Sequence, residues 1–207
     1  MTTPRDLQII AMLVAMDADS PRPVDPGDLS LALAGAEVID LLHAGAVALD
    51  GDRIVPEDRD RRAPADRLLD AAASALVRQA PYETVEDWLW RRGRGLSAVY
   101  RAALTEEGLI IRKRRRLPFR TGRTALASSS ATRGHAADRW ASGEPVLAAL
   151  AAAAHIHDAP AADSLSGTDD AVMTVLAAVN EAVVELEAVR QRRSVEQAAF
   201  DNIWRSV

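Results

Sequence analysis

The sequence contains no cysteine among its 207 residues, which excludes disulfide bonds, thiol nucleophiles, iron–sulfur clusters and cysteine-based zinc sites. Lysine is almost absent as well, since Lys113 is the only lysine among 25 basic residues and the others are arginine. Aromatic residues make up 4% of the chain. The abundance of arginine and alanine indicates a GC-rich bacterial genome. Because alanine has the highest helix propensity, this composition favours a mainly α fold.

Long apolar runs are absent too. No uninterrupted apolar stretch approaches the roughly 20 residues that a helix needs to cross a bilayer. The first residues, MTTPRDLQII, lack the basic and apolar regions of a secretory signal. Hydrophobic residues nevertheless form 48% of the chain, which is enough for a sizeable core. We therefore expect a single globular domain over residues 1–207 that resides in the cytoplasm.

Catalytic and metal-binding motifs are also missing. The chain contains no GxSxG elbow, no GxGxxG or GxxxxGK[ST] phosphate loop and no HExxH pair. His155 and His157 are two residues apart, so on a helix their side chains point in different directions and do not favour a shared metal ion. We expect neither an enzyme nor a bound cofactor or metal.

Charge is present in quantity, but it is segregated along the chain. The formal net charge is −5, whereas residues 91–133 carry twelve basic residues against only Glu106 and Glu107. Five of the basic residues are consecutive, in the run RKRRR from Arg112 to Arg116. Like charges in such a run repel one another and find no carboxylate nearby in sequence. This pattern predicts an anionic partner for the basic segment, although the arginines could also pair with the acidic remainder of the chain.

Hydrophobic periodicity and capping residues predict a series of helices and two hairpins. Asp28 is the expected N-cap of the second helix, and Gly93 and Gly95 are expected to break the fourth. The stretch SSSATRGHAAD at 128–138 is predicted to be a polar linker. Asp50 and Gly51 favour a small hairpin near residues 46–55, and a protruding basic hairpin is expected near residues 109–125. The expected helices cover residues 5–16, 28–45, 66–78, 83–107, 145–157 and 169 to the C-terminus.

The tip of the basic hairpin combines cations with apolar residues. Leu117, Pro118 and Phe119 lie between the RKRRR run and Arg120. At a membrane surface, cations approach anionic headgroups while leucine and phenylalanine enter the acyl boundary. We therefore expect Leu117 and Phe119 to insert into a membrane; the alternative is that both pack inward as alternate residues of a strand.

Several stretches, taken in order, resemble the Golgi phosphoprotein 3 family. They are LALAGAEVIDLLHAGAVAL at 31–49, PADRLLDAA at 64–72, PYETVEDWL at 81–89 and LTEEGLI at 104–110, and the opening DLQIIAMLVAMDAD is similar as well. The resemblance implies an α-rich single domain with a protruding hairpin implicated in oligomerisation. It also implies a peripheral membrane protein that binds phosphatidylinositol 4-phosphate.

The resemblance places four lipid-binding positions on this sequence. The family uses a tryptophan before the second helix, an arginine in an LRG stretch, and two arginines one turn apart. The corresponding positions here are Asp25, Ala34, Arg94 and Ser97, so that only Arg94 matches, while Arg91 lies one turn before it. Binding that relies on summed charge, and not on one pocket, therefore fits this chain better.

The sequence thus predicts a non-enzymatic peripheral membrane or adaptor protein on the inner face of the membrane. It would bind anionic phospholipid, including phosphatidylinositol 4-phosphate, and form homo-oligomers through the basic hairpin. The alternatives are a winged-helix-like DNA-binding regulator, which the lack of Asn, Gln and Lys in residues 88–107 disfavours, and a self-assembling interaction protein. The expected lipid-binding residues are Arg91, Arg94, Arg101, Arg112, Lys113, Arg114, Arg115 and Arg116, with Leu117 and Phe119 as the insertion pair.

Overall fold

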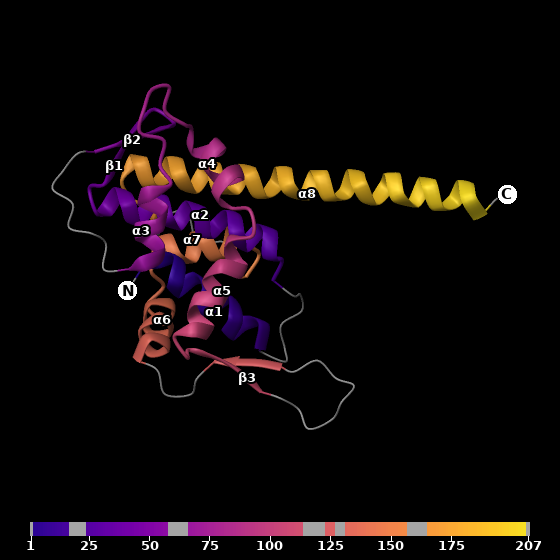
Figure 1. The fold of residues 1–207 in the computed structure, drawn as a ribbon, viewed down its shortest axis with the longest axis horizontal. Coiled ribbons are helices and arrows are strands. Elements are labelled where there is room, and N and C mark those ends of the chain that lie inside the picture. The colour runs from indigo at the N-terminus through magenta and orange to yellow at the C-terminus, as the bar shows by residue number, and fades with distance from the viewer. Residues whose placement is uncertain are drawn as a thin grey trace.

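The computed structural model describes residues 2–16, 24–57, 66–113, 123–126, 131–156 and 165–205. Within these residues the chain forms eight helices and two antiparallel hairpins (Figure 1), which confirms the mainly α fold class. The elements are α1 (Thr3–Met16), α2 (Pro26–His43), β1 (Val47–Asp50), β2 (Arg53–Pro56), α3 (Arg67–Ser74), α4 (Val85–Arg92), α5 (Leu96–Glu106), β3 (Ile110–Lys113), β4 (Arg123–Leu126), α6 (Ala131–Ala141), α7 (Pro145–Ala153) and α8 (Asp170–Arg205).

Helix α2 is the centre of the molecule. Every residue from 28 to 39 is buried, and the helix packs against α1, α4, α5, α7 and α8. A helix that is apolar on nearly all sides must be surrounded in this way, because each exposed face would leave apolar surface in water. The second helix that the sequence predicts is therefore confirmed.

The start of α2 differs from the prediction. Asp25 is the N-cap, and its carboxylate accepts hydrogen bonds from the backbone N–H groups of Gly27 (2.7 Å) and Asp28 (3.2 Å). Pro26 occupies the first helical position, where its fixed φ suits a helix start and its missing N–H costs nothing. The prediction of Asp28 as N-cap was wrong by three residues, since Asp28 lies within the first turn and pairs with Arg190 of α8 at 2.6 Å.

Both hairpins form where the sequence predicts them. Strands β1 and β2 join through a tight turn at Gly51, whose φ of +62° lies in the left-handed region that glycine tolerates. Strands β3 and β4 pair from Ile110 with Leu126 to Lys113 with Arg123. The connection between β3 and β4 lies outside the described residues.

Glycines separate α4 from α5, as the sequence predicted. Gly95 precedes the first residue of α5 and has a φ of +71°. At Gly93, a Cβ atom would lie 2.5 Å from the backbone oxygen of Leu89 and 3.3 Å from Leu31 of α2. Only glycine allows the chain to pass this close to α2 while it changes direction.

Residues 131–141 form helix α6, so the prediction of a polar linker there was wrong. Ala136 is fully buried and packs with Ile9, Leu104 and Ile110. Arg139 donates to the buried carboxylate of Asp6 at 2.6 Å. The segment carries too few large apolar residues for a clear periodic signal, and contacts with α1 supply the stability that its own sequence lacks. Helix α7 also ends at Ala153, before its predicted end at residue 157.

Helix α8 has two different halves. Its first part buries a stripe that includes Val172, Val175, Val179 and Val183 against the body. Residues 191–198 are all exposed, and this part of the helix projects beyond the other elements (Figure 1). Among the described residues, no helix has the length and apolar character needed to cross a membrane.

Candidate functional site

Helix α5 presents one apolar face to the core and a different face to solvent. Leu96, Tyr100 and Leu104 are buried at helical spacing against α1 and α2. On the outside, Ala98, Val99, Arg101 and Ala102 are exposed, and Val99 retains 47% of its accessible surface. Arg94 is exposed just before the helix begins. We call the group of Arg94, Ala98, Val99, Arg101 and Ala102 the α5 face.

The two arginines of the α5 face are not paired. Among the residues that the structure describes, neither the Arg94 nor the Arg101 guanidinium forms a hydrogen bond or an ion pair. The backbone carbonyl of Arg101 accepts from Thr105 Oγ1 at 2.7 Å, but this contact leaves the side chain free. Both cations are therefore available to an external anion.

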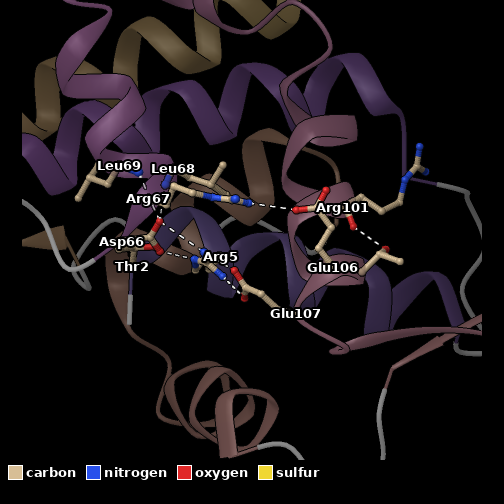
Figure 2. Close-up of polar contacts among 10 residues, drawn as sticks. Thr2, Arg5, Asp66, Arg67, Leu68, Leu69, Arg101, Glu106 and Glu107 are labelled. Atoms are coloured by element: carbon tan, nitrogen blue, oxygen red, sulfur yellow. Dashed lines mark hydrogen bonds and ion pairs between the residues drawn. The ribbon is translucent and has the colours of Figure 1, made fainter.

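Both carboxylates of the basic segment are already engaged by arginines from outside it (Figure 2). Glu107 accepts from Arg5 of α1 at 2.6 and 2.9 Å, and Arg5 also pairs with the α3 N-cap Asp66. Glu106 accepts from Arg67 of α3 at 3.1 Å. In Figure 2 the Arg101 side chain points away from this network. As a result, neither Glu106 nor Glu107 neutralises the cations of the α5 face.

Arg91, the first predicted lipid ligand, is held by the protein itself. Its guanidinium donates to both oxygens of Glu83, at 2.7 Å for the shortest contact, and to the carbonyl of Ala75 at 3.1 Å. It also lies 5.2 Å from the ring centre of Trp88, within the range of a cation–π contact. Arg91 is half exposed, but its charge is largely compensated, so we expect it to contribute less to binding than Arg94 and Arg101.

Arg92, next in sequence, faces inward. It donates to both carboxylate oxygens of Glu37 at 2.8 and 2.9 Å, and Tyr100 Oη donates to the same carboxylate at 3.1 Å. Glu37 is fully buried in α2. Burial raises the pKa of Glu37, while the bonds from Arg92 and Tyr100 oppose that rise. The basic segment therefore supplies one arginine to the core, a role that its sequence did not reveal.

The other predicted site residues follow α5 directly. Helix α5 contacts strand β3, to which Arg112 and Lys113 belong. In the hairpin ladder Arg112 pairs with Thr124 and Lys113 with Arg123. The remaining members of the predicted set lie outside the described residues, and their roles stay predictions: Arg114, Arg115, Arg116, Leu117 and Phe119.

Three of the four positions carried over from the family resemblance have internal roles. Asp25 caps α2 and pairs with Arg190. Ala34 is fully buried, and its carbonyl accepts from Trp88 Nε1 at 3.1 Å. Ser97 donates through Oγ to the carbonyl of Pro26 at 3.1 Å. Of these positions only Arg94 presents a donor to solvent.

The described residues contain no group of three histidine, aspartate or glutamate side chains that could hold a metal ion. His155 lies beside a single carboxylate, with Nδ1 at 3.3 Å from Asp28 Oδ2. The α5 face with its two unpaired cations is therefore the candidate site among the described residues.

A comparison with protein families finds a match to the family described as Golgi phosphoprotein 3 (GPP34), over residues 10–197. The match covers nearly all the helices and both hairpins. A search among curated proteins found no significant match.

Proposed function

This chain belongs to the Golgi phosphoprotein 3 family, and from that premise we propose that it is a non-enzymatic peripheral membrane or adaptor protein. In this proposal it binds anionic phospholipid on the inner face of the membrane through the α5 face and the β3–β4 hairpin. Family membership fits a lipid-binding or adaptor role in general. The details proposed here come from the arrangement of charge on this chain.

The observation that carries the proposal is the pair of unpaired arginines on the α5 face. A surface arginine that has no partner adds little to folding, since even a formed surface ion pair contributes only about 0–1 kcal/mol. Near an anionic membrane the same residue contributes about 1 kcal/mol. Arg94 and Arg101 therefore gain more from a lipid surface than from their own protein.

The neighbouring elements extend this surface. Val99 is also exposed on α5 and offers an apolar side chain to the headgroup region. Strand β3 continues from α5 with Arg112 and Lys113, followed in sequence by Arg114, Arg115 and Arg116. If the hairpin lies on the same membrane, Leu117 and Phe119 supply its insertion tip. Binding would then depend on summed charge and shallow apolar contact.

Co-sedimentation with vesicles tests this proposal. Three vesicle types are compared at low and high salt: neutral phosphatidylcholine, phosphatidylcholine with phosphatidylserine, and phosphatidylcholine with phosphatidylinositol 4-phosphate at matched charge. We expect binding to both anionic types, weaker at high salt because the contacts are between exposed charges. Preference for the phosphoinositide at equal charge would indicate a headgroup site beyond summed charge.

The insertion tip is tested in the same assay with Leu117→Ser/Phe119→Ser, which keeps every cation. We expect weaker binding than wild type at both salt concentrations, because the lost contact is apolar. Failure of wild-type protein to bind any of the three vesicles would overturn the membrane proposal and favour nucleic acid or a second copy of the chain as the anionic partner.

A further inference from the structure

A pocket of about 340 Å³ lies where the C-terminal end of α2, strand β1 and the N-terminus of α8 meet. No residue of the α5 face lines it. Its volume is in the range of small-molecule sites. Most of its wall is apolar, with Leu42, Val47, Leu49 and Val172 prominent, and two ionisable side chains, His43 and Asp169, also line it. The pocket thus combines an apolar floor with a small polar rim.

The carboxylate in this rim is only partly engaged. Asp169 Oδ1 accepts from the backbone N–H of Ala171 at 2.8 Å and so caps α8. Asp169 Oδ2 has no hydrogen-bond partner among the described residues. Asp170 follows in the chain and Asp50 ends β1, and both are exposed. In the described part of the chain, no basic side chain pairs with any of these three carboxylates.

The outer edge of β1 adds backbone acceptors to the same rim. The turn at Gly51 and the bond from the Glu57 N–H to the Ala46 carbonyl set the pairing of β1 with β2. In this register the backbone groups of Val47 and Leu49 point away from β2. They have no hydrogen-bond partner among the described residues, and both residues line the pocket.

We propose that this pocket binds a small amphipathic organic cation, such as a primary alkylammonium. The ammonium group would donate to Asp169 Oδ2 and to a carbonyl of the β1 edge, beside His43. The alkyl chain would lie on Leu42 and Val172. This inference does not rest on the proposed membrane function, because the pocket is elsewhere in the fold and, among the described residues, its lining includes a carboxylate and no arginine.

The charge of the rim selects a cation over other ligands of similar size. The N-terminus of a helix attracts anions, but Asp169 already occupies that end of α8. An alkyl carboxylate would therefore meet the carboxylate of Asp169 and be repelled. A neutral alcohol would keep the apolar contact but lose the charge-assisted hydrogen bond, which is about twice as strong as a neutral one. The three ligands have similar size and apolar character, so a higher affinity for the ammonium would come from its charge.

Titration of the full chain with hexylammonium, followed by ¹H–¹⁵N NMR, tests the proposal. We expect saturable shift changes confined to residues 42–50 and 169–172, and affinity at least tenfold higher than for hexanol or hexanoate. Asp169→Asn should raise the Kd at least tenfold while α8 remains intact, because asparagine caps a helix as well as aspartate does. Ala171→Leu, which narrows the pocket, should abolish saturable binding of all three compounds.

Asp87→Asn, an exposed carboxylate in the first turn of α4, is the matched control and should leave the Kd unchanged. Equal affinity for hexylammonium and hexanol would overturn the assignment of a cation. Shift changes that are spread over the acidic surface and are equally sensitive to Asp87→Asn would show unspecific charge attraction and would overturn the site. If the wild-type protein failed to bind vesicles, the expected binding of hexylammonium would not change. The two proposals can therefore fail separately.

Discussion

Arg92 and Arg94 are two residues apart, yet they belong to two regions that differ in whether the charges are paired. Arg92 lies in the interior and shares the buried carboxylate of Glu37 with Tyr100, whereas Arg94 and Arg101 lie on the α5 face without an ionic partner among the described residues. A buried charge must be paired or the fold loses several kcal/mol, while an exposed unpaired charge contributes little to folding. Arginines of the first kind therefore explain the fold, and those of the second kind are available to an external partner.

The interior region should respond most strongly to substitution. Arg92→Ala leaves the Glu37 carboxylate buried without its cation, and we expect it to lower the free energy of unfolding by about 3–5 kcal/mol. Urea denaturation measures this difference. Arg94→Ala, two residues away, serves as the control and should change stability by no more than about 0.5 kcal/mol. Similar values for the two variants would contradict the division into two regions.

The α5 face should respond in binding and not in stability. Arg94→Ser/Arg101→Ser removes two cations that each contribute about 1 kcal/mol near an anionic surface, so we expect roughly 30-fold weaker binding to phosphatidylserine vesicles. Its unfolding midpoint in urea should match that of wild type. Arg192→Ser/Arg193→Ser removes the same charge from the exposed part of α8 and is the matched control. Equal weakening by both variants would show that net charge, and not the α5 face, governs binding.

Buried carboxylates give the interior a pH dependence. Burial raises the pKa of Asp40 above its ordinary value of 3.8, against the opposing hydrogen bond from the Thr3 N–H at 2.8 Å. Because the pKa of Asp40 is higher in the folded state than in the unfolded state, its contribution to the free energy of unfolding is complete below the unfolded-state pKa. This contribution declines as the pH rises through the folded-state pKa. From pH 4 to 7, wild type should therefore lose stability relative to Asp40→Asn. Each tenfold difference in proton affinity between the folded and unfolded states lowers the free energy of unfolding by about 1.4 kcal/mol.

Asparagine keeps an acceptor for the Thr3 N–H, so that the comparison with Asp40→Asn isolates the charge. Urea denaturation at four pH values between 4 and 7 measures the difference. A difference that stays constant over this range, or that grows in favour of wild type, would show that Asp40 is not penalised by burial.

Arg91 should give the smallest effect on vesicle binding, because Glu83 already compensates its charge. The Arg91 side chain is half exposed, whereas that of Glu83 is 8% exposed, so Arg91→Ala should cost less stability than Arg92→Ala but more than Arg94→Ala. Its charge is compensated, and we expect its effect on vesicle binding to be smaller than that of Arg101→Ser alone. Binding data that rank Arg91 above Arg101 would mean that Arg91 leaves Glu83 when the protein meets lipid.

Much of the fold could be predicted because its signals are local. Asp66 caps α3, Gly93 and Gly95 separate α4 from α5, and the Asp50–Gly51 pair marks the first hairpin. Each of these signals lies within a few residues of the structure that it specifies. Helix α6 was missed because its stability comes from distant contacts, such as that of Arg139 with Asp6.

The site was predictable only in outline, for a similar reason. The excess of cations in residues 91–133 is visible in the sequence, but which of them are free depends on partners far along the chain. Arg92 meets Glu37, which is 55 residues away, and Glu107 meets Arg5 at a separation of 102. Hydrophobic periodicity carries no information about such pairs, so the sequence alone does not show that Arg91 is engaged by Glu83 while Arg94 is unpaired among the described residues.

The most direct test of the α5 face uses the absence of cysteine from the chain. Ala98→Cys and Val184→Cys each create a single labelling site, one on the α5 face and one on the exposed side of α8, for an environment-sensitive fluorophore. With phosphatidylserine vesicles we predict a blue shift and increased emission from the label at position 98 and an unchanged spectrum at position 184. Unchanged emission at position 98 while the protein co-sediments with the vesicles would contradict the account.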